Sequence, residues 1–236
     1  MTIIRVVDFE TSGTEPSEGA EVCEVGICDL HLVERRIDEP KSWLCAVKAM
    51  PPEVRAVHHI SLAECSDYDA FRVEDLFAHA SGMPAAIAAH NSEFETKFFE
   101  SPVPVICTYK TALRIWPDAP SHSNGALRYW LEDQGKIAPV HHLTQPAHRA
   151  GPDAYVTAHI LLALIDAGAT GRDMIAWTKE PRLLPKCPIG KFRGQPWCEV
   201  EAGFLGWMLR QPTMEEDLKW NAQREIARRQ NGAMAQ

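Results

Sequence analysis

The sequence predicts an α/β fold in which helices flank a mixed β-sheet. Near the N-terminus, apolar β-forming runs follow one another with short polar connections, which is typical of antiparallel strands. Further along the chain, short apolar strands alternate with helical segments. Hydrophobic residues make up 45% of the 236 residues, which is enough to form a core.

The antiparallel part of the sheet is predicted in the first fifty residues. Ile3–Gly13 is rich in isoleucine and valine and ends at a glycine, so it is expected to contain the first strand. A polar loop, Thr14–Ala20, separates it from a second strand at Val22–Cys28. Ser42–Val47 is predicted to be the third strand.

The rest of the main domain is predicted from helical periodicity and from helix breakers. Short buried strands are expected at Ala85–Ala89 and Val105–Cys107, and Gly135–Ala147 is expected to be a polar loop. The predicted helices are a short turn at Val54–His59, Val73–Ser81, the helix begun by Glu93–Phe99, Tyr109–Trp116, Asn124–Asp133 and a long apolar helix from Pro152 to Ala167.

The C-terminal part is predicted to be a small appendage. We expect a main domain at 1–168, a linker with one short helix at 169–185 and a C-terminal module at 186–236. Phe204 and Trp207 have helical spacing, and Glu215–Arg229 is charged and helix-forming. With few apolar residues, the module is not expected to have a core of its own.

Composition narrows the functional classes. A net charge of −8 disfavours a protein that coats nucleic acid, but a nuclease with acids at a metal site is compatible with it. No apolar run is long enough to span a membrane, and the N-terminus has no signal-peptide pattern. The seven cysteines include no C-x-x-C pair, which favours reduced thiols. We therefore expect a cytoplasmic protein without a membrane partner.

Two acidic residues lie close together in the first predicted strand. Asp8 and Glu10 are two residues apart, so their side chains share one face of the strand. Neighbouring like charges repel each other unless a cation lies between them. Ligand sets made only of oxygen suit hard ions such as Mg²⁺ and Mn²⁺. Taken alone, the pair could also be two surface acids at a solvated strand end, which is the commoner case.

Two further stretches make the functional interpretation of the acidic pair more specific. Ala89–Glu95 follows a buried strand, and His148–Ala154 opens the last long helix with a His-x-x-x-x-Asp spacing. In this order, the three motifs resemble those of the DEDDh superfamily of proofreading 3′→5′ exonucleases. Three more stretches resemble the exodeoxyribonuclease X branch of that superfamily: Cys107–Pro117, Ser123–Tyr129 and Ile189–Gly194. The resemblance covers roughly residues 3–210.

The resemblance implies a ribonuclease H-like fold with a five-stranded mixed sheet, and phosphodiester hydrolysis assisted by two divalent cations, Mg²⁺ or Mn²⁺. The cations would be held by Asp8, Glu10, Glu95 and Asp153, with Asp8 bridging both. His148 would be the general base, because histidine is the side chain whose ordinary pKa lies near neutrality.

The chain departs from the family pattern at two positions. Glu95 stands where aspartate is usual, which moves the carboxylate one methylene further out. It could then contact a metal-bound water rather than the ion, weaken the site, or be a surface residue of a helix. Thr14 stands where an apolar residue often wedges against the terminal bases, so efficient fraying of duplex ends is not expected.

Residues next to the acidic motifs are candidates for substrate contact. The predicted contacts are Phe9, Thr11, Ser12, Gly13, Asn91 and Phe94. Phe9 points away from the carboxylates, so a place in the core is favoured over a base platform, and the residues after it could simply form a loop. A phosphate-binding rim is expected from Lys97, Lys110, Arg114, Arg128 and Arg149, with a second patch from Lys186, Lys191 and Arg193.

The resemblance therefore predicts a metal-dependent 3′→5′ exonuclease that releases nucleoside monophosphates from DNA. Single strands should be preferred, because the pocket must hold an unpaired end. RNA remains open as the substrate, since no residue decides how the 2′-hydroxyl is treated. A third reading is a nucleic-acid-binding module that is catalytically silent because of Glu95. A homodimer is also left open.

Overall fold

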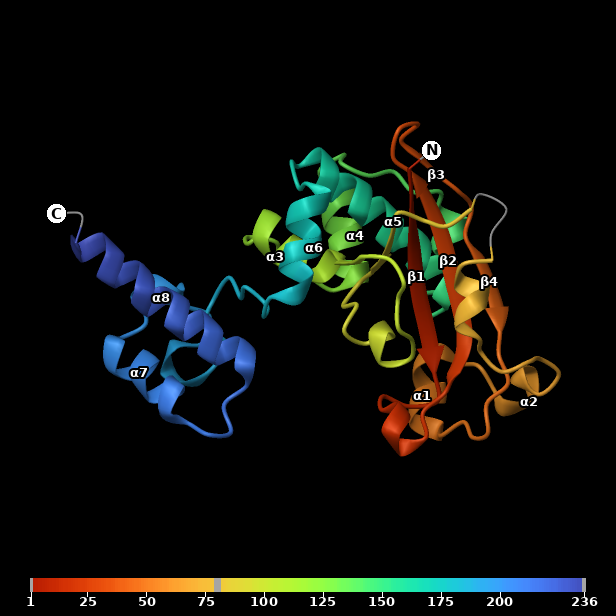
Figure 1. The fold of residues 1–236 in the computed structure, drawn as a ribbon, viewed down its shortest axis with the longest axis horizontal. Coiled ribbons are helices and arrows are strands. Elements are labelled where there is room, and N and C mark those ends of the chain that lie inside the picture. Colours follow the sequence, from red (N-terminus) through yellow and green to blue (C-terminus); the bar gives the residue numbers. More distant parts are fainter. Residues whose placement is uncertain (1, 79–81, 235–236) are drawn as a thin grey trace.

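The computed structural model describes residues 2–78 and 82–234 and contains a mixed sheet flanked by helices (Figure 1). The strands are β1 (Ile3–Thr11), β2 (Val22–His31), β3 (Arg36–Ile37), β4 (Lys41–Leu44), β5 (Ala86–Ala89) and β6 (Val105–Cys107). β1 pairs antiparallel with β2 and parallel with β5, and β6 runs parallel to β5 at the edge. β3 and β4 pair with different parts of β2, so six segments form five rows, and the predicted mixed sheet is confirmed.

Eight helices surround or follow the sheet in the part of the chain that the structure describes. They are α1 (Pro52–His58), α2 (Leu62–Cys65), α3 (Thr108–Ile115), α4 (Asn124–Asp133), α5 (Ala150–Asp166), α6 (Gly171–Lys179), α7 (Ala202–Arg210) and α8 (Glu216–Met234). The predicted helices at α1, α3, α4 and α5 are confirmed. No single described helix is both long and apolar enough to cross a membrane, although α5 and α6 meet that test as a pair bent by 115°.

Two expected helices are only 3₁₀ turns. The helix expected at Val73–Ser81 is a 3₁₀ turn at Val73–Leu76, and residues 79–81 lie outside the described part of the chain. The carbonyl of Leu76 accepts a hydrogen bond of 2.6 Å from the buried Arg5 guanidinium, which ties this turn to β1. The helix expected to begin with Glu93–Phe99 keeps only Glu95–Lys97, where the N–H groups of Lys97 and Phe98 donate to carbonyls three residues earlier.

The two faces of the sheet pack into separate parts of the core. On one face, Ile4 and Val6 of β1 contact the buried side of α5 together with α3, α4 and α6. On the other face, Val7 and Phe9 pack among Leu76 and neighbouring phenylalanines. This alternation places the even-numbered residues of β1 toward α5. All seven cysteines are unpaired, and all but Cys198 are buried, as expected for reduced thiols.

The C-terminal region differs from its prediction in two ways. α6 lies within the expected linker, but its Met174 is buried in the main core, so the main domain extends through α6. The module after it has its own hydrophobic core, which corrects the expectation that it would have none. That core consists of Cys187, Phe192, Trp197, Val200, Leu205, Met208, Leu218 and Ala222. The residues are scattered in sequence, and only the packing of α7 against α8 gathers them (Figure 1).

Candidate active site

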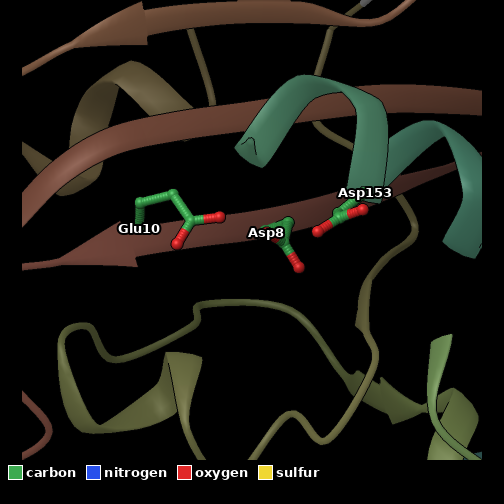
Figure 2. A group of neighbouring side chains, drawn as sticks. All are labelled: Asp8, Glu10 and Asp153. Atoms are coloured by element: carbon green, nitrogen blue, oxygen red, sulfur yellow. The ribbon is translucent and has the colours of Figure 1, made fainter. Parts of the chain in front are cut away.

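Three carboxylates from two elements converge at one end of β1. Asp8 and Glu10 lie on the face of β1 that looks toward α5, and Asp153 lies in the first turn of α5 (Figure 2). One carboxylate oxygen from each of the three lies within 4.8 Å of the other two. The prediction that Asp8 and Glu10 share a face is therefore confirmed, and the third motif meets them.

The first turn of α5 is held against β2 by two features. Gly26 of β2 lies directly under the helix, and a Cβ atom there would be 2.0 Å from the carbonyl oxygen of Ala150, so only glycine permits this approach. Glu24, two residues earlier, accepts hydrogen bonds from Arg149 Nη2 at 2.7 Å and Arg149 Nε at 2.9 Å. It also accepts one from the backbone N–H of Ala150 at 3.0 Å. These contacts set the position of Asp153.

Glu24 was not identified from the sequence as part of the site. It is 2% exposed and lies directly across the β1–β2 ladder from Glu10. The signal in the sequence was a single acidic residue inside the otherwise apolar segment Val22–Cys28. Such a residue is expected to have a buried partner, but the sequence does not show that the partner is Arg149, 125 residues away.

The electrostatics of the cluster are unfavourable without a counter-charge. Burial, followed by repulsion from Asp153, Glu95 and Glu10, raises the pKa of Asp8 well above its usual value. Burial and repulsion from Asp153 and Glu24 raise the pKa of Glu10 to about 8. The carboxylates therefore cannot all ionise easily near neutral pH unless a cation joins them.

Glu95 lies beside the three converging acids rather than on the surface. Its side chain is 3% exposed, and among the described residues Oε2 has no hydrogen-bond partner. Burial raises its pKa to about 8, and its charge repels that of Asp8. The reading of Glu95 as a surface helix residue is therefore wrong. A short 3₁₀ turn, not a helix, aims the side chain inward.

This donor set fits a divalent cation. Asp8, Glu10 and Asp153 supply oxygen ligands from three directions, and the unpartnered oxygen of Glu95 lacks a donor. Hard cations such as Mg²⁺ and Mn²⁺ prefer such all-oxygen surroundings. A cation at this point would remove the repulsion that raises the pKa of Asp8.

His148 lies on the loop that leads into α5. Its backbone N–H donates a hydrogen bond of 3.1 Å to Oδ2 of Asp153, which orients the carboxylate. This contact requires a left-handed backbone at His148, with φ of 58°. The side chain is exposed. An exposed imidazole next to the acidic cluster is accessible to a water molecule and to substrate.

The predicted substrate contacts at the end of β1 and in the loop after it interact mainly with other parts of the protein. The ring of Phe9 packs 5.2 Å from Phe71 between ring centroids, so its inclusion among the substrate-binding side chains is corrected. The hydroxyl of Thr11 donates to the carbonyl of Gly13 at 2.6 Å. The hydroxyl of Ser12 accepts the N–H of Glu21 at 2.9 Å. These hydroxyls shape a loop, because the strand must turn here.

The predicted contacts of the second motif lie nearer to solvent. Asn91 is exposed, and Phe94 is half-buried with its ring centroid 5.5 Å from that of Phe98. Both flank the turn that carries Glu95. They are placed where a terminal nucleotide could reach them, and their role stays a prediction.

The expected rim of phosphate-binding cations in the main domain is corrected. All five of its members form ion pairs, at distances of 2.6–2.8 Å: Lys97 with Glu15, Lys110 with Glu93, Arg114 with Glu180, Arg128 with Glu132 and Arg149 with Glu24. Lys110 and Arg128 are also buried. The sequence indicates positive charge at these positions but cannot show which acid neutralises it.

Comparison with known proteins is consistent with this site. A family model described as "Exonuclease" matches residues 6–161. The chain belongs to this exonuclease family. Exodeoxyribonuclease 10 of Escherichia coli strain K12 is 30% identical to it over 213 residues, covering 87% of this chain and 90% of the relative. The predicted resemblance to the exodeoxyribonuclease X branch is thereby confirmed.

Solved structures give the same family and fold. Exonuclease X in complex with 5′ overhanging duplex DNA is 29% identical, with a TM-score of 0.59, over 74% of this exonuclease and 99% of that chain. Cell-death related nuclease 4 shares the fold at 16% identity and a TM-score of 0.57, over 72% of this chain and 65% of that one. The protein is an exonuclease, a hydrolase acting on nucleic acids, and its family uses divalent metal ions.

Proposed function

We propose that this exonuclease removes nucleotides from the 3′ end of DNA, prefers single strands and releases nucleoside monophosphates. The observation that carries the proposal is the convergence of Asp8, Glu10 and Asp153 on one partly buried point, with the unpartnered oxygen of Glu95 beside them. The choice of DNA is supported by the relative named an exodeoxyribonuclease and by a related structure titled as a complex with duplex DNA.

The four carboxylates would hold two divalent cations, Mg²⁺ or Mn²⁺. When bound, such a pair activates water and neutralises the charge on the phosphate and on the leaving oxygen. Asp8 is repelled by Asp153, Glu95 and Glu10, which supports a central place for it among the residues that would hold the cations. Asp153 can offer Oδ1 to a cation while Oδ2 accepts the N–H of His148.

His148 would take the proton from the attacking water. An imidazole can accept a proton near neutral pH, and this one is exposed at the start of α5. The backbone hydrogen bond to Asp153 ties the loop that carries His148 to the proposed cation ligand. The leaving 3′-oxygen would receive its proton from solvent.

The test is the degradation of a 5′-labelled single-stranded DNA with Mg²⁺ or Mn²⁺. A ladder that shortens from the 3′ end is expected, and Asp153→Ala should abolish it. Asp133→Ala makes the same chemical change at an exposed residue near the end of α4 and should leave the rate unchanged. A matched RNA shows whether the enzyme is instead an exoribonuclease.

Thermal melting with and without Mn²⁺ tests the metal site independently of turnover. Binding of the ion only to the folded state raises the melting temperature by mass action. Folded protein that yields no ladder on either polymer and gains no stability at millimolar metal would contradict the exonuclease proposal. It would favour a silent nucleic-acid-binding module.

A further inference from the structure

We propose that the groove between residues 117–122 and the C-terminal module binds the phosphodiester backbone of the substrate strand upstream of its 3′ end, with Lys186 and Arg193 as the cationic contacts. The groove has a volume of about 690 Å³. This inference rests on the proposed function, because it takes a DNA strand as the occupant. It adds a binding surface outside the acidic cluster and gives the C-terminal module a role.

Charge is distributed unevenly along the chain. Residues 1–181 carry 15 lysines and arginines against 26 acids, a net charge of −11. Residues 182–236 carry nine lysines and arginines against six acids, a net charge of +3. A polyanion approaching the main domain is repelled on average, whereas the module attracts it. The cations needed to hold a strand are therefore most available in the module.

Several candidate phosphate-binding cations are already occupied by ion pairs. The predicted phosphate-binding residues of the main domain are neutralised by ion pairs. Lys191 of the module also pairs, with Glu201 at 3.0 Å. Lys186 and Arg193 are exposed and have no ion-pair partner among residues 2–78 and 82–234. Both line the groove, where Asp118 is the acid among the described lining residues.

A tight loop presents Arg193 to the groove. The stretch from Gly190 to Gly194 resembles the family's C-terminal motif and forms a tight loop closed by the Gly194 N–H, which donates to the carbonyl of Cys187 at 2.8 Å. Phe192 is buried and anchors the loop in the module's core. Gly190 has φ of 61°, and a Cβ there would be 2.9 Å from the ring of Phe204. The loop is thus built to hold Arg193 outward beside a rigid core.

Hydrogen bonds link the main-domain side of the groove to the acidic motifs. Residues 117–122 form the main-domain side of the groove and lead directly into α4. Asn124, at the start of α4, donates a hydrogen bond of 3.1 Å to the carbonyl of Asp153. The carbonyl of His122 accepts one of 2.8 Å from His90, the residue before Asn91 in the second motif. The groove is therefore connected through single hydrogen bonds to two of the three motifs.

The chemistry of the lining suits a single strand. Lys186 and Arg193 can contact phosphates without reading base identity. Pro117, Pro120 and Pro188 supply apolar surface for sugars and bases. A sequence-tolerant grip of this kind is what an exonuclease needs, since every nucleotide passes through the same position.

The experiment measures binding of a labelled single-stranded DNA in EDTA, where no cleavage occurs. The double variant Lys186→Ala with Arg193→Ala should weaken binding by about tenfold at moderate salt. The slope of log affinity against log salt should become shallower by about 1.4, because each neutralised phosphate of a single strand contributes about 0.7. Both side chains are exposed, so folding should be unaffected, and thermal melting checks this.

The matched control is Arg210→Ala with Lys219→Ala, which removes two charges from α7 and α8 outside the groove. It should change affinity by less than about twofold. Equal losses of affinity in both double variants would show that only the net charge of the module matters. That result would overturn the proposal that the groove binds the strand. An unchanged affinity in the groove variant would overturn the proposal outright.

Substrate length separates this proposal from the exonuclease proposal. With Mg²⁺, the groove variant should raise KM for an oligonucleotide of about 30 nucleotides. It should leave kcat/KM unchanged for one of about three, which has almost no chain upstream of its 3′ end. If the exonuclease proposal is wrong, neither oligonucleotide is degraded. The binding measurement in EDTA still tests whether the groove binds DNA. Equal loss for both lengths would place Lys186 and Arg193 in the acidic site and contradict the proposal.

Discussion

Charged residues face each other at two places in the β1–β2 ladder. One pair has opposite charges, and the other pair has like charges. Arg5 lies opposite Asp29 and is held by two hydrogen bonds of 2.8 Å. Glu10 lies opposite Glu24 in the same ladder, on the other face of the sheet. Opposite charges across a ladder stabilise it and like charges destabilise it. The first pair stabilises the fold, whereas the second is expected to be retained for the proposed cation site.

Burial sharpens the difference between the pairs. Arg5 is fully buried, but its guanidinium is satisfied by Asp29 and by the carbonyl of Leu76. On the other face, Arg149 offsets Glu24, while Glu10 keeps a pKa of about 8. Uncompensated charge that a fold retains is more informative about function than compensated charge, because the fold alone gives no reason to keep it.

The largest effect is expected from Asp8→Asn, which removes the central acid of the uncompensated set. Nuclease activity should fall by about three orders of magnitude or more, because the proposed bridging ligand is lost. The metal-free protein should melt at a higher temperature, because repulsion around a buried carboxylate is relieved. Rates on labelled DNA and melting curves in EDTA check both. A variant that is inactive and also less stable would contradict the comparison.

The second expected effect is on stability, from Arg5→Ala. Breaking a buried ion pair while leaving its partner costs about 3–5 kcal/mol of unfolding free energy. The activity per folded molecule should remain near that of the unaltered protein, since this pair lies on the face away from the acidic cluster. Urea unfolding and active-site-normalised rates test the two parts. An equal loss of rate would show that the two faces are not independent.

A smaller effect is expected from Glu24→Gln. Glu24 belongs to the like-charged pair, but its own charge is offset by Arg149. Glutamine keeps one acceptor oxygen but loses the charge that holds Arg149 and the start of α5. Stability should fall by about 1–2 kcal/mol and activity by about tenfold. The metal affinity from Mn²⁺ titration should fall with it. Arg36→Gln, at an exposed residue of β3, is the matched control and should leave metal affinity unchanged.

The smallest effect is a change in the pH dependence of stability. Glu10 and Glu95 have pKa values of about 8 in the folded protein, above the ordinary glutamate value, so the folded state binds more protons between about pH 4.5 and pH 8. Metal-free stability should therefore fall as the pH rises through this window. A cation competes with those protons, so the melting shift caused by Mn²⁺ should be larger at about pH 8 than at about pH 5. A melting shift of the same size at both pH values would contradict the raised pKa values of Glu10 and Glu95.

Several features of the site could be inferred from local sequence. Strand periodicity put Asp8 and Glu10 on one face, and the first-turn proline with the apolar run after it located the helix that carries Asp153. The same alternation placed Phe9 in the core. These inferences succeed because they depend only on backbone geometry and on neighbours within a few residues.

Other features could not be inferred, because they depend on residues far apart in the chain. The charge of Arg149 was visible, but its partner Glu24 lies 125 residues away. Burial of Glu95 follows from how its 3₁₀ turn packs against β1, which no local pattern reports. The module's core combines residues from 187 to 222 that show no continuous apolar face.

The chain's residues and their order thus specify the chemistry of this exonuclease: three acidic motifs, a histidine near the last of them and an α/β framework. Packing settles which of those charges are neutralised. It pairs the five candidate phosphate-binding cations of the main domain with acids, and it leaves Lys186 and Arg193 without ion-pair partners among the described residues. It also brings Asp8, Glu10 and Asp153 together at one point, with Glu95 buried beside them. The physical reason is that electrostatic energy depends on distance and burial in three dimensions, and neither is encoded locally in the chain.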